Sequence, residues 1–89
     1  MNGAWRYELT PRAERDMARS PVDVRRRVFA ALDRLIVGGE AGNVRRLTGQ
    51  LEGEWRLRVG DWRVRFRPDR ERRVYVVLRV LPRGRAYRD

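Results

Sequence analysis

The chain has 89 residues, a formal net charge of +10 and a pI of about 11.6. All 22 cationic side chains are arginines, and cysteine and histidine are both absent. These counts exclude disulfides, thiolate catalysis and zinc–thiolate sites. We therefore expect one domain over residues 1–89, with no metal and no cofactor.

The charge also narrows the class of partner. Self-repulsion at this charge lowers stability, so polyanions are the natural partners: nucleic acid, an anionic membrane surface or a strongly acidic protein. No stretch approaches 18 apolar residues, and residues 1–10 contain no apolar signal-peptide core. We therefore expect a cytoplasmic protein that does not bind a membrane.

The first half of the chain predicts one strand and two helices. Residues 4–9 are typical of a short strand, and Thr10-Pro11 form a helix start signal for a helix to about Arg19. Ser20-Pro21 repeat that signal, with Asp23 in the capping-box position. The second helix is expected to run to about Val37 and to end at Gly38-Gly39. Its apolar stripe consists of Val24, Val28, Leu32, Leu35 and Ile36.

The second half predicts three strands. Residues 40–53 are expected to form a connection with a helical turn around residues 44–47. Strands follow at 54–59, 62–67 and 74–81, with a tight turn at Gly60-Asp61 and a polar turn at 68–73. The order is β-α-α-β-β-β. The expected fold class is α+β, with a helical hairpin packed on one face of a small, mainly antiparallel four-stranded sheet.

Strict alternation divides the strand residues between two sheet faces. The apolar set is expected to form the core: Trp55, Leu57, Val59, Trp62, Val64 and Phe66. The opposite face then carries Arg56, Arg58, Arg63, Arg65 and Arg67. In the last strand, alternation separates Val74, Val76, Leu78 and Val80 from Tyr75, Val77, Arg79 and Leu81.

Arginines crowded on one sheet face repel one another unless an anion lies between them. Guanidinium groups bind phosphate oxygens in pairs, which favours nucleic acid as that anion. RNA can be cleaved without a metal when its 2′-OH attacks the adjacent phosphate and cations stabilise the developing charge. The plainer alternative is a solvated outer face.

Three segments resemble the RelE/ParE toxin superfamily of type II toxin–antitoxin systems, closer to the RelE-like mRNA interferase branch. They are residues 44–49 (VRRLTG), 54–64 (EWRLRVGDWRV) and 83–88 (RGRAYR). The resemblance implies a ribosome-dependent, metal-independent mRNA endonuclease that inhibits translation. By position it implies a catalytic set consisting of Arg56, Arg58, Arg63, Arg83 and Tyr87.

Six further arginines are expected to bind nucleic acid around that set. They are Arg45, Arg46, Arg65, Arg79, Arg85 and Arg88. The resemblance also implies that a cognate acidic antitoxin holds the toxin in a hetero-oligomer, and that the ribosome and mRNA are its targets. Two alternatives remain open: a ParE-like inhibitor of DNA gyrase with no catalytic activity of its own, and a non-toxic protein, which is either a basic nucleic-acid-binding module or a decayed toxin.

Overall fold

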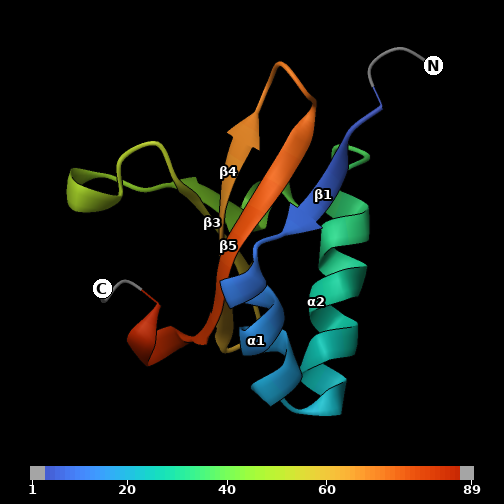
Figure 1. Ribbon diagram of the computed structural model, residues 1–89, viewed down its shortest axis with the longest axis vertical. Helices are drawn as coiled ribbons and strands as arrows, with labels where there is room; N and C mark the ends of the chain where they lie inside the picture. The colour runs from blue at the N-terminus through green and yellow to red at the C-terminus, as the bar shows by residue number, and fades with distance from the viewer. Residues whose placement is uncertain (1–3, 87–89) are drawn as a thin grey trace.

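A computed structural model describes residues 4–86 (Figure 1). In chain order the elements are β1 (Arg6–Leu9), α1 (Pro11–Arg19), α2 (Val22–Leu35), β2 (Val44–Arg46), β3 (Trp55–Val59), β4 (Trp62–Asp69) and β5 (Val74–Pro82). Short 3₁₀ turns occupy Ala41–Asn43, Gly49–Leu51 and Arg83–Arg85. The expected α+β class, with two helices after the first strand, is confirmed.

The sheet has five strands in the order β1-β5-β4-β3-β2. β1 is parallel to β5, and the other neighbours are antiparallel. The expectation of four strands was therefore wrong, because Val44–Arg46 form β2 and not a helical turn. Three residues are too few to show an alternation, and β2 is defined by its pairing with residues 55–57 of β3.

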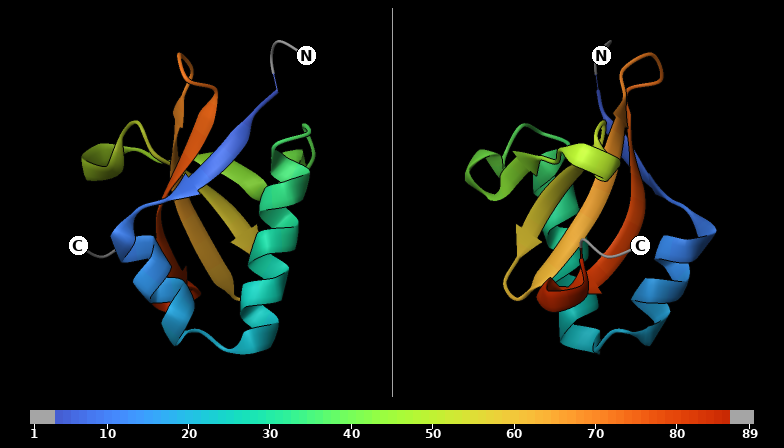
Figure 2. Two further views of the ribbon diagram at one scale, coloured as in Figure 1. Left: turned by 45° about the vertical axis from the view of Figure 1, so that its right-hand side comes forward. Right: turned by 90° about the vertical axis from the view of Figure 1, so that its left-hand side faces the viewer.

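The core lies between the sheet and the two helices. Figure 2 shows α2 along one face of the sheet and α1 beside β5. The buried cluster joins the apolar stripes of both helices to the apolar face of the strands. It contains Ala13, Met17, Val24, Val28, Ala31, Leu32, Leu35, Leu57, Val59, Val64, Phe66, Val77 and Val80. Trp55 and Trp62 pack against this cluster, as the alternation predicted.

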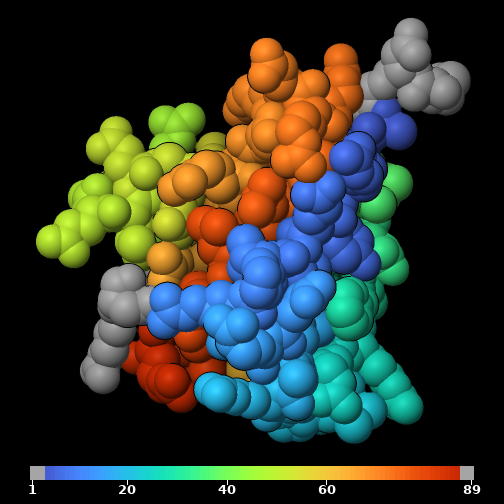
Figure 3. All heavy atoms as spheres, viewed as in Figure 1, coloured from blue at the N-terminus to red at the C-terminus, as the bar shows by residue number. Residues whose placement is uncertain are grey.

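Helix α1 completes the edge of the sheet where β1 ends. β1 pairs only with residues 74–77 of β5. Directly after β1, the Thr10 N–H donates to the Val77 carbonyl at 3.0 Å. Farther along β5, the Val80 N–H donates to the Asp16 carboxylate of α1 at 2.9 Å. Figure 3 shows the surface of α1 directly against that of β5. The lower half of β5 is thereby protected from pairing with another chain.

The predicted N-cap of α1 is confirmed, and the predicted N-cap of α2 is wrong. The Thr10 hydroxyl accepts from the Ala13 N–H at 3.1 Å, so Thr10 is the expected N-cap of α1. The Ser20 N-cap was wrong, because α2 begins at Val22 behind Pro21 and has no side-chain cap. The Ser20 hydroxyl instead donates to the Met17 carbonyl at 2.7 Å and closes α1.

A β-bulge in β5 corrects the expected division of that strand. Arg65 pairs with Arg79 but the next residue, Phe66, pairs with Val77, so Leu78 is the extra residue. Val77 and Val80 therefore both face the core, and the alternation that separated them was wrong. Arg79 and Leu81 lie on the outer face with Val74 and Val76, whose partners are Asp69 and Arg67. Tyr75 faces inward, packs against the core and stacks on Trp5.

Candidate nucleic-acid interface

Four arginines lie in register across four neighbouring strands on the outer face of the sheet. Arg45 on β2 pairs with Arg56 on β3, Arg56 with Arg65 on β4, and Arg65 with Arg79 on β5. We call these four residues the arginine row. Adjacent strands are about 4.8 Å apart, so their side chains start close enough to repel one another.

Carboxylates neutralise the two members of the row that lie on β4 and β5, Arg65 and Arg79. Arg65 is 5% exposed, its Nε donates to Glu54 at 2.8 Å, and its Nη1 donates to the Ala86 carbonyl at 3.3 Å. Arg79 donates from Nε to Asp16 at 2.8 Å. Burial raises the pKa of Asp16, but the hydrogen bonds from Arg79 and the Val80 N–H outweigh it and leave the pKa lowered. Arg65 and Arg79 therefore stabilise the fold, and their side chains are nearly buried on the outer face of the sheet.

The sequence interpretation missed both of these carboxylates. Glu54 directly precedes β3 with the same alternation as Arg56, which was a usable signal. Asp16 gave no such signal, because only the crossing of α1 over the edge of β5 brings it to Arg79.

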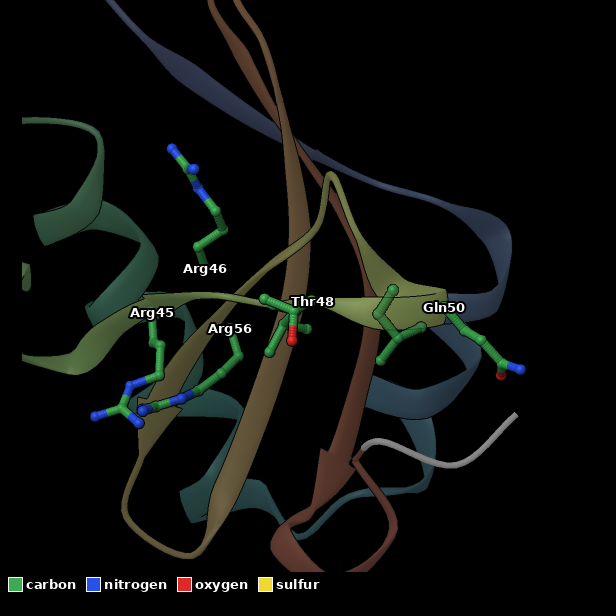
Figure 4. Close-up of a pocket in the computed structure, with 7 residues that line it drawn as sticks. Arg45, Arg46, Thr48, Gln50 and Arg56 are labelled. Carbon is green, nitrogen blue, oxygen red and sulfur yellow. The ribbon is translucent and has the colours of Figure 1, made fainter.

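The two members of the row that lie on β2 and β3 border an open hollow. Arg45 and Arg56 line a hollow of about 550 Å³ together with Thr48 and Gln50. In Figure 4 the side chains of Arg45 and Arg56 extend to the same side and bring their guanidinium groups together. Arg56 also donates to the Asn43 carbonyl at 3.2 Å. The segment with Gly49–Leu51 projects from the body beside this hollow (Figure 3).

Arg46 lies on the other side of β2. Its register partner is Trp55, and its guanidinium carbon is 5.3 Å from the centre of the Trp55 ring. In Figure 4 its side chain points away from those of Arg45 and Arg56. Arg46 therefore makes a cation–π contact with Trp55 and is not part of the arginine row, although it also lines the hollow beside Arg45 and Arg56.

A second group of arginines gathers at the end of the sheet formed by the β3–β4 turn. Arg58 lies directly opposite Arg63 in the β3–β4 pair. The Arg63 side chain donates to the carbonyls of Gly60 and Trp62, both at 2.9 Å. The Arg83 N–H donates to the Asp61 carbonyl at 2.8 Å, which ties the turn after β5 to the start of β4. We call Arg58, Arg63 and Arg83 the end cluster.

Three predicted site residues remain, namely Arg85, Tyr87 and Arg88. Arg85 is exposed in the turn after β5 and lines a hollow with Arg79 and Arg19. Tyr87 and Arg88 lie outside the described residues. Within residues 4–86 no group of three His, Cys, Asp or Glu side chains could hold a metal ion, and neither helix is long and apolar enough to cross a membrane.

Solved structures of RelE toxins have the same fold. The RelE–RelB complex of Pyrococcus horikoshii matches with 26% identity and a TM-score of 0.75, over 93% of this chain and 99% of that one. The RelBE2 toxin–antitoxin complex of Mycobacterium tuberculosis matches with 27% identity and a TM-score of 0.67, over 90% and 99%. The isolated RelE toxin of E. coli matches in fold at 17% identity, with a TM-score of 0.75 over 94% and 89%.

The fold and its basic face thus define a small toxin of the RelE/ParE superfamily. The sequence model of one family, the ParE toxin of the type II toxin–antitoxin system parDE, matches residues 7–87. The chain belongs to this family. No curated protein sequence matches it.

Proposed function

We propose that the chain is a ribosome-dependent, metal-independent mRNA endonuclease that stops translation. The observation that carries the proposal is the end cluster. Arg58 and Arg63 are register partners, and the backbone of Arg83 is bonded to the residue before β4. Two neighbouring strands and the turn after β5 thereby place three arginines at one end of the sheet, and cations gathered there would suit a phosphate that gains charge.

The proposed chemistry needs cations at the phosphate, which the chain supplies, and a proton acceptor, which solvent or the ribosome supplies. The 2′-oxygen of the RNA attacks the adjacent phosphorus and its proton passes to solvent or to a ribosomal group. The bond to the 5′-oxygen breaks, that oxygen takes up a proton, and the products are a cyclic phosphate and a 5′-hydroxyl. Arginine stays protonated throughout, so the end cluster stabilises charge and aligns the phosphate. Tyr87 is proposed to position the attacking nucleotide.

The hollow beside Arg45 and Arg56 supports the binding part of the proposal. It is polar, open and bordered by cations at the edge of the same face. Such a surface contacts the backbone of the mRNA or of ribosomal RNA by displacing counterions, so the affinity falls steeply with salt. The arginines in the row and the tail then bind RNA while the end cluster acts on one phosphate.

An acidic antitoxin is the proposed regulatory partner. The RelE toxins of P. horikoshii and M. tuberculosis are seen in complexes with their antitoxins. A chain with a net charge of +10 gains stability when a partner rich in Asp and Glu neutralises the outer face. We propose a toxin–antitoxin hetero-oligomer that acts in the cytoplasm, where ribosomes are found.

A second candidate function is inhibition of DNA gyrase without chemistry. One observation favours it: the matching family is described by the ParE toxin and not by RelE. Under this alternative the basic face would contact the gyrase target or the antitoxin, and the end cluster would contribute binding alone.

One induction experiment separates the two functions. The chain is expressed briefly without a partner, and protein synthesis, mRNA 5′ ends and DNA breaks are followed together. The proposal expects translation to stop first, with new 5′ ends inside translated codons. Early DNA breaks with intact mRNA would instead identify a gyrase inhibitor.

The same experiment is repeated with a variant in which Arg63, Arg83 and Tyr87 are all replaced by alanine. We expect mRNA cleavage to fall by a factor of about 100 or more, because oxyanion-stabilising groups are lost. The matched control is Arg26→Ala with Arg70→Ala, since both arginines are exposed and lie outside the outer-face sites. Unchanged toxicity and mRNA cleavage in the triple variant would disprove the endonuclease.

A further inference from the structure

A separate hollow lies at the edge of the sheet, where the pairing with β2 has ended and the last residues of β3 lie against α2 (Figure 2). Its volume is about 330 Å³. Among the described residues, the charged side chains that line it are three arginines and one carboxylate. The polar lining and the turn glycine are Arg27 and Arg34 from α2, Glu40 and Asn43 from the connection after α2, and Arg58 and Gly60 from β3 and its turn. Neither Arg27 nor Arg34 belongs to the expected site residues.

Glu40 fixes one wall of the hollow. Its side chain is 7% exposed, and one carboxylate oxygen accepts from Nε of Arg34 while the other accepts from Nδ2 of Asn43 at 2.9 Å. These two hydrogen bonds lower the pKa of Glu40, so the carboxylate stays ionised. Oδ1 of Asn43 in turn accepts from Nη2 of Arg58 at 3.3 Å. The amide of Asn43 therefore connects the fixed carboxylate to the guanidinium of Arg58 on β3.

Arg27 reaches the hollow from the helix because residue 60 is a glycine. A Cβ at position 60 would lie 1.9 Å from Nη2 and 3.1 Å from Cζ of Arg27, so the guanidinium lies directly against the backbone of the β3–β4 turn. A larger residue at this position would displace Arg27. The turn thus leaves room for an arginine of α2 beside the end of β3.

The two walls carry cations that no carboxylate pairs. Within residues 4–86, neither Arg27 nor Arg58 forms an ion pair with an Asp or Glu side chain. Both oxygens of Glu40 are already engaged by Arg34 and Asn43, and Asp61 does not line the hollow. Arg27 and Arg58 therefore bring positive charge from α2 and from β3 to one hollow, and both are exposed to solvent.

We propose that this hollow binds a phosphate group, with Arg27 and Arg58 donating to its oxygens from the two walls and Asn43 holding Arg58 in place. Phosphate is favoured over a carboxylate because its oxygens diverge in three dimensions, so guanidinium groups on different walls can each bind one. The hydrogen bond from Arg58 to Asn43 forms before any ligand arrives, which lowers the entropic cost of binding.

The position of the hollow deepens the proposed function. Arg58 lines the hollow and also belongs to the end cluster, where Arg63 lies opposite to it. A phosphodiester in the hollow therefore belongs to a nucleotide that flanks the cleaved one. Free phosphate and a nucleic-acid backbone share the same chemistry. The assignment of RNA as the source rests on the proposed function, whereas the binding of phosphate itself does not.

The first test uses the full chain and inorganic phosphate, with no ribosome present. The Nε–H signals of the arginines are followed by NMR while phosphate replaces chloride at constant ionic strength. We expect the signals of Arg27 and Arg58 to shift together with one dissociation constant, and the signal of Arg26 to stay in place. The absence of a phosphate-dependent shift at Arg27 would overturn the proposal.

Matched variants of neighbouring arginines give the second test. Arg27→Gln is compared with Arg26→Gln, which changes the net charge equally on the same helix but outside the hollow. Both residues are exposed, so both variants are expected to fold. We expect phosphate binding to weaken about tenfold in Arg27→Gln and to stay within about twofold in the control. Equal phosphate affinities of the two variants would refute the site.

Gly60→Ala tests the placement of Arg27 independently, because the added Cβ occupies the position of its Nη2. We expect phosphate binding to weaken by about threefold or more in the otherwise unchanged chain, and by no further amount in the Arg27→Gln background. Both measurements are made at a temperature where all variants are folded. An equal loss in the two backgrounds would contradict the assignment of Arg27 to the site.

A last titration identifies the source of the phosphate. The same proteins are titrated with a short single-stranded RNA and with an oligoglutamate peptide. We expect Arg27→Gln to lower the salt dependence of RNA binding by about one released counterion relative to Arg26→Gln. Phosphate binding without any effect of Arg27→Gln on RNA binding would identify free phosphate as the ligand and overturn the RNA assignment. Binding of oligoglutamate but not of phosphate at Arg27 would identify a contact for an acidic protein and contradict the proposal.

These outcomes are separate from those of the proposed function. Cleavage of mRNA is tested by the variant of Arg63, Arg83 and Tyr87, none of which lines this hollow within the described residues. A chain that binds phosphate at Arg27 but leaves mRNA intact would retain the site and lose the endonuclease. A chain that cleaves mRNA but shows no phosphate binding at Arg27 would retain the endonuclease and lose the site.

Discussion

The carboxylate of Asp16 accepts a hydrogen bond of 2.8 Å from Nε of Arg79. The same oxygen accepts the N–H of Val80 at 2.9 Å. This relationship connects α1 to β5 at the point where β1 no longer covers the edge of the sheet. Asp16 thereby neutralises the nearly buried Arg79 and also accepts the Val80 N–H, which β1 leaves without a strand partner.

Replacement of Asp16 by alanine should therefore destabilise the protein strongly. The substitution leaves the guanidinium of Arg79 and the Val80 N–H without this acceptor in a poorly solvated position, and we expect a loss of about 3 kcal/mol in the free energy of unfolding. Urea denaturation measures it. Glu71→Ala in the exposed turn before β5 is the control and should change stability by less than about 0.5 kcal/mol. A loss below about 1 kcal/mol for Asp16→Ala would show that solvent replaces the pair.

The same aspartate should make stability depend on pH in the acid range. The pKa of Asp16 is lowered in the folded protein, so the unfolded chain binds its proton more readily. Its contribution is present above its ordinary pKa of about 4 and is lost as the pH falls through the lower, folded value. The free energy of unfolding measured between pH 6 and pH 2.5 should fall less steeply in Asp16→Asn than in the wild type. Parallel curves would contradict this linkage.

Arg65 and Arg45 of the arginine row should respond differently to truncation. Arg65→Ala leaves the nearly buried Glu54 without its main partner and should cost about 3 kcal/mol in the free energy of unfolding. Arg45→Ala removes an exposed side chain and should cost less than about 0.5 kcal/mol, while RNA binding loses about one released counterion. Thermal unfolding and salt-dependent RNA binding measure the two effects. Similar stabilities of the two variants would contradict a structural role for Arg65.

The β3–β4 turn requires glycine at position 60. Gly60 has a φ of 58°, and an added Cβ would lie 1.9 Å from Nη2 of Arg27 on α2. Since the guanidinium of Arg27 can move, backbone strain sets most of the cost, and Gly60→Ala should lower stability by about 1 kcal/mol. Gly42→Ala is the matched control, because its Cβ would meet open space at an ordinary φ. Equal melting temperatures of the two variants would rule out this strain.

The Gly60 turn also positions the end cluster, since its carbonyl accepts from Arg63. A shifted turn should therefore lower any activity that depends on Arg63 more than it lowers stability. The comparison of mRNA cleavage in Gly60→Ala and Gly42→Ala measures this effect at a temperature where both variants are folded.

The local sequence pattern determined most of the secondary structure. A period of two separated Trp55, Leu57 and Val59 from Arg56 and Arg58, and the Thr10-Pro11 pair marked the start of α1. These predictions hold because alternation and N-capping depend on residues close together in the chain. The concentration of arginines on one face followed from the same pattern, and the register pairs Arg56–Arg65 and Arg58–Arg63 confirm it.

Only the tertiary structure decided that Arg65 and Arg79 are paired with carboxylates. β2 exists through its pairing with β3, and the bulge at Leu78 depends on how β5 lies against β4. The ion pairs of Arg65 with Glu54 and of Arg79 with Asp16 join residues 11 and 63 positions apart. The sequence could place arginines on a face by short-range periodicity, but their neutralisation depends on long-range contacts. For that reason the arginine row divides into Arg65 and Arg79, which are paired with carboxylates, and Arg45 and Arg56, which border the hollow beside β2.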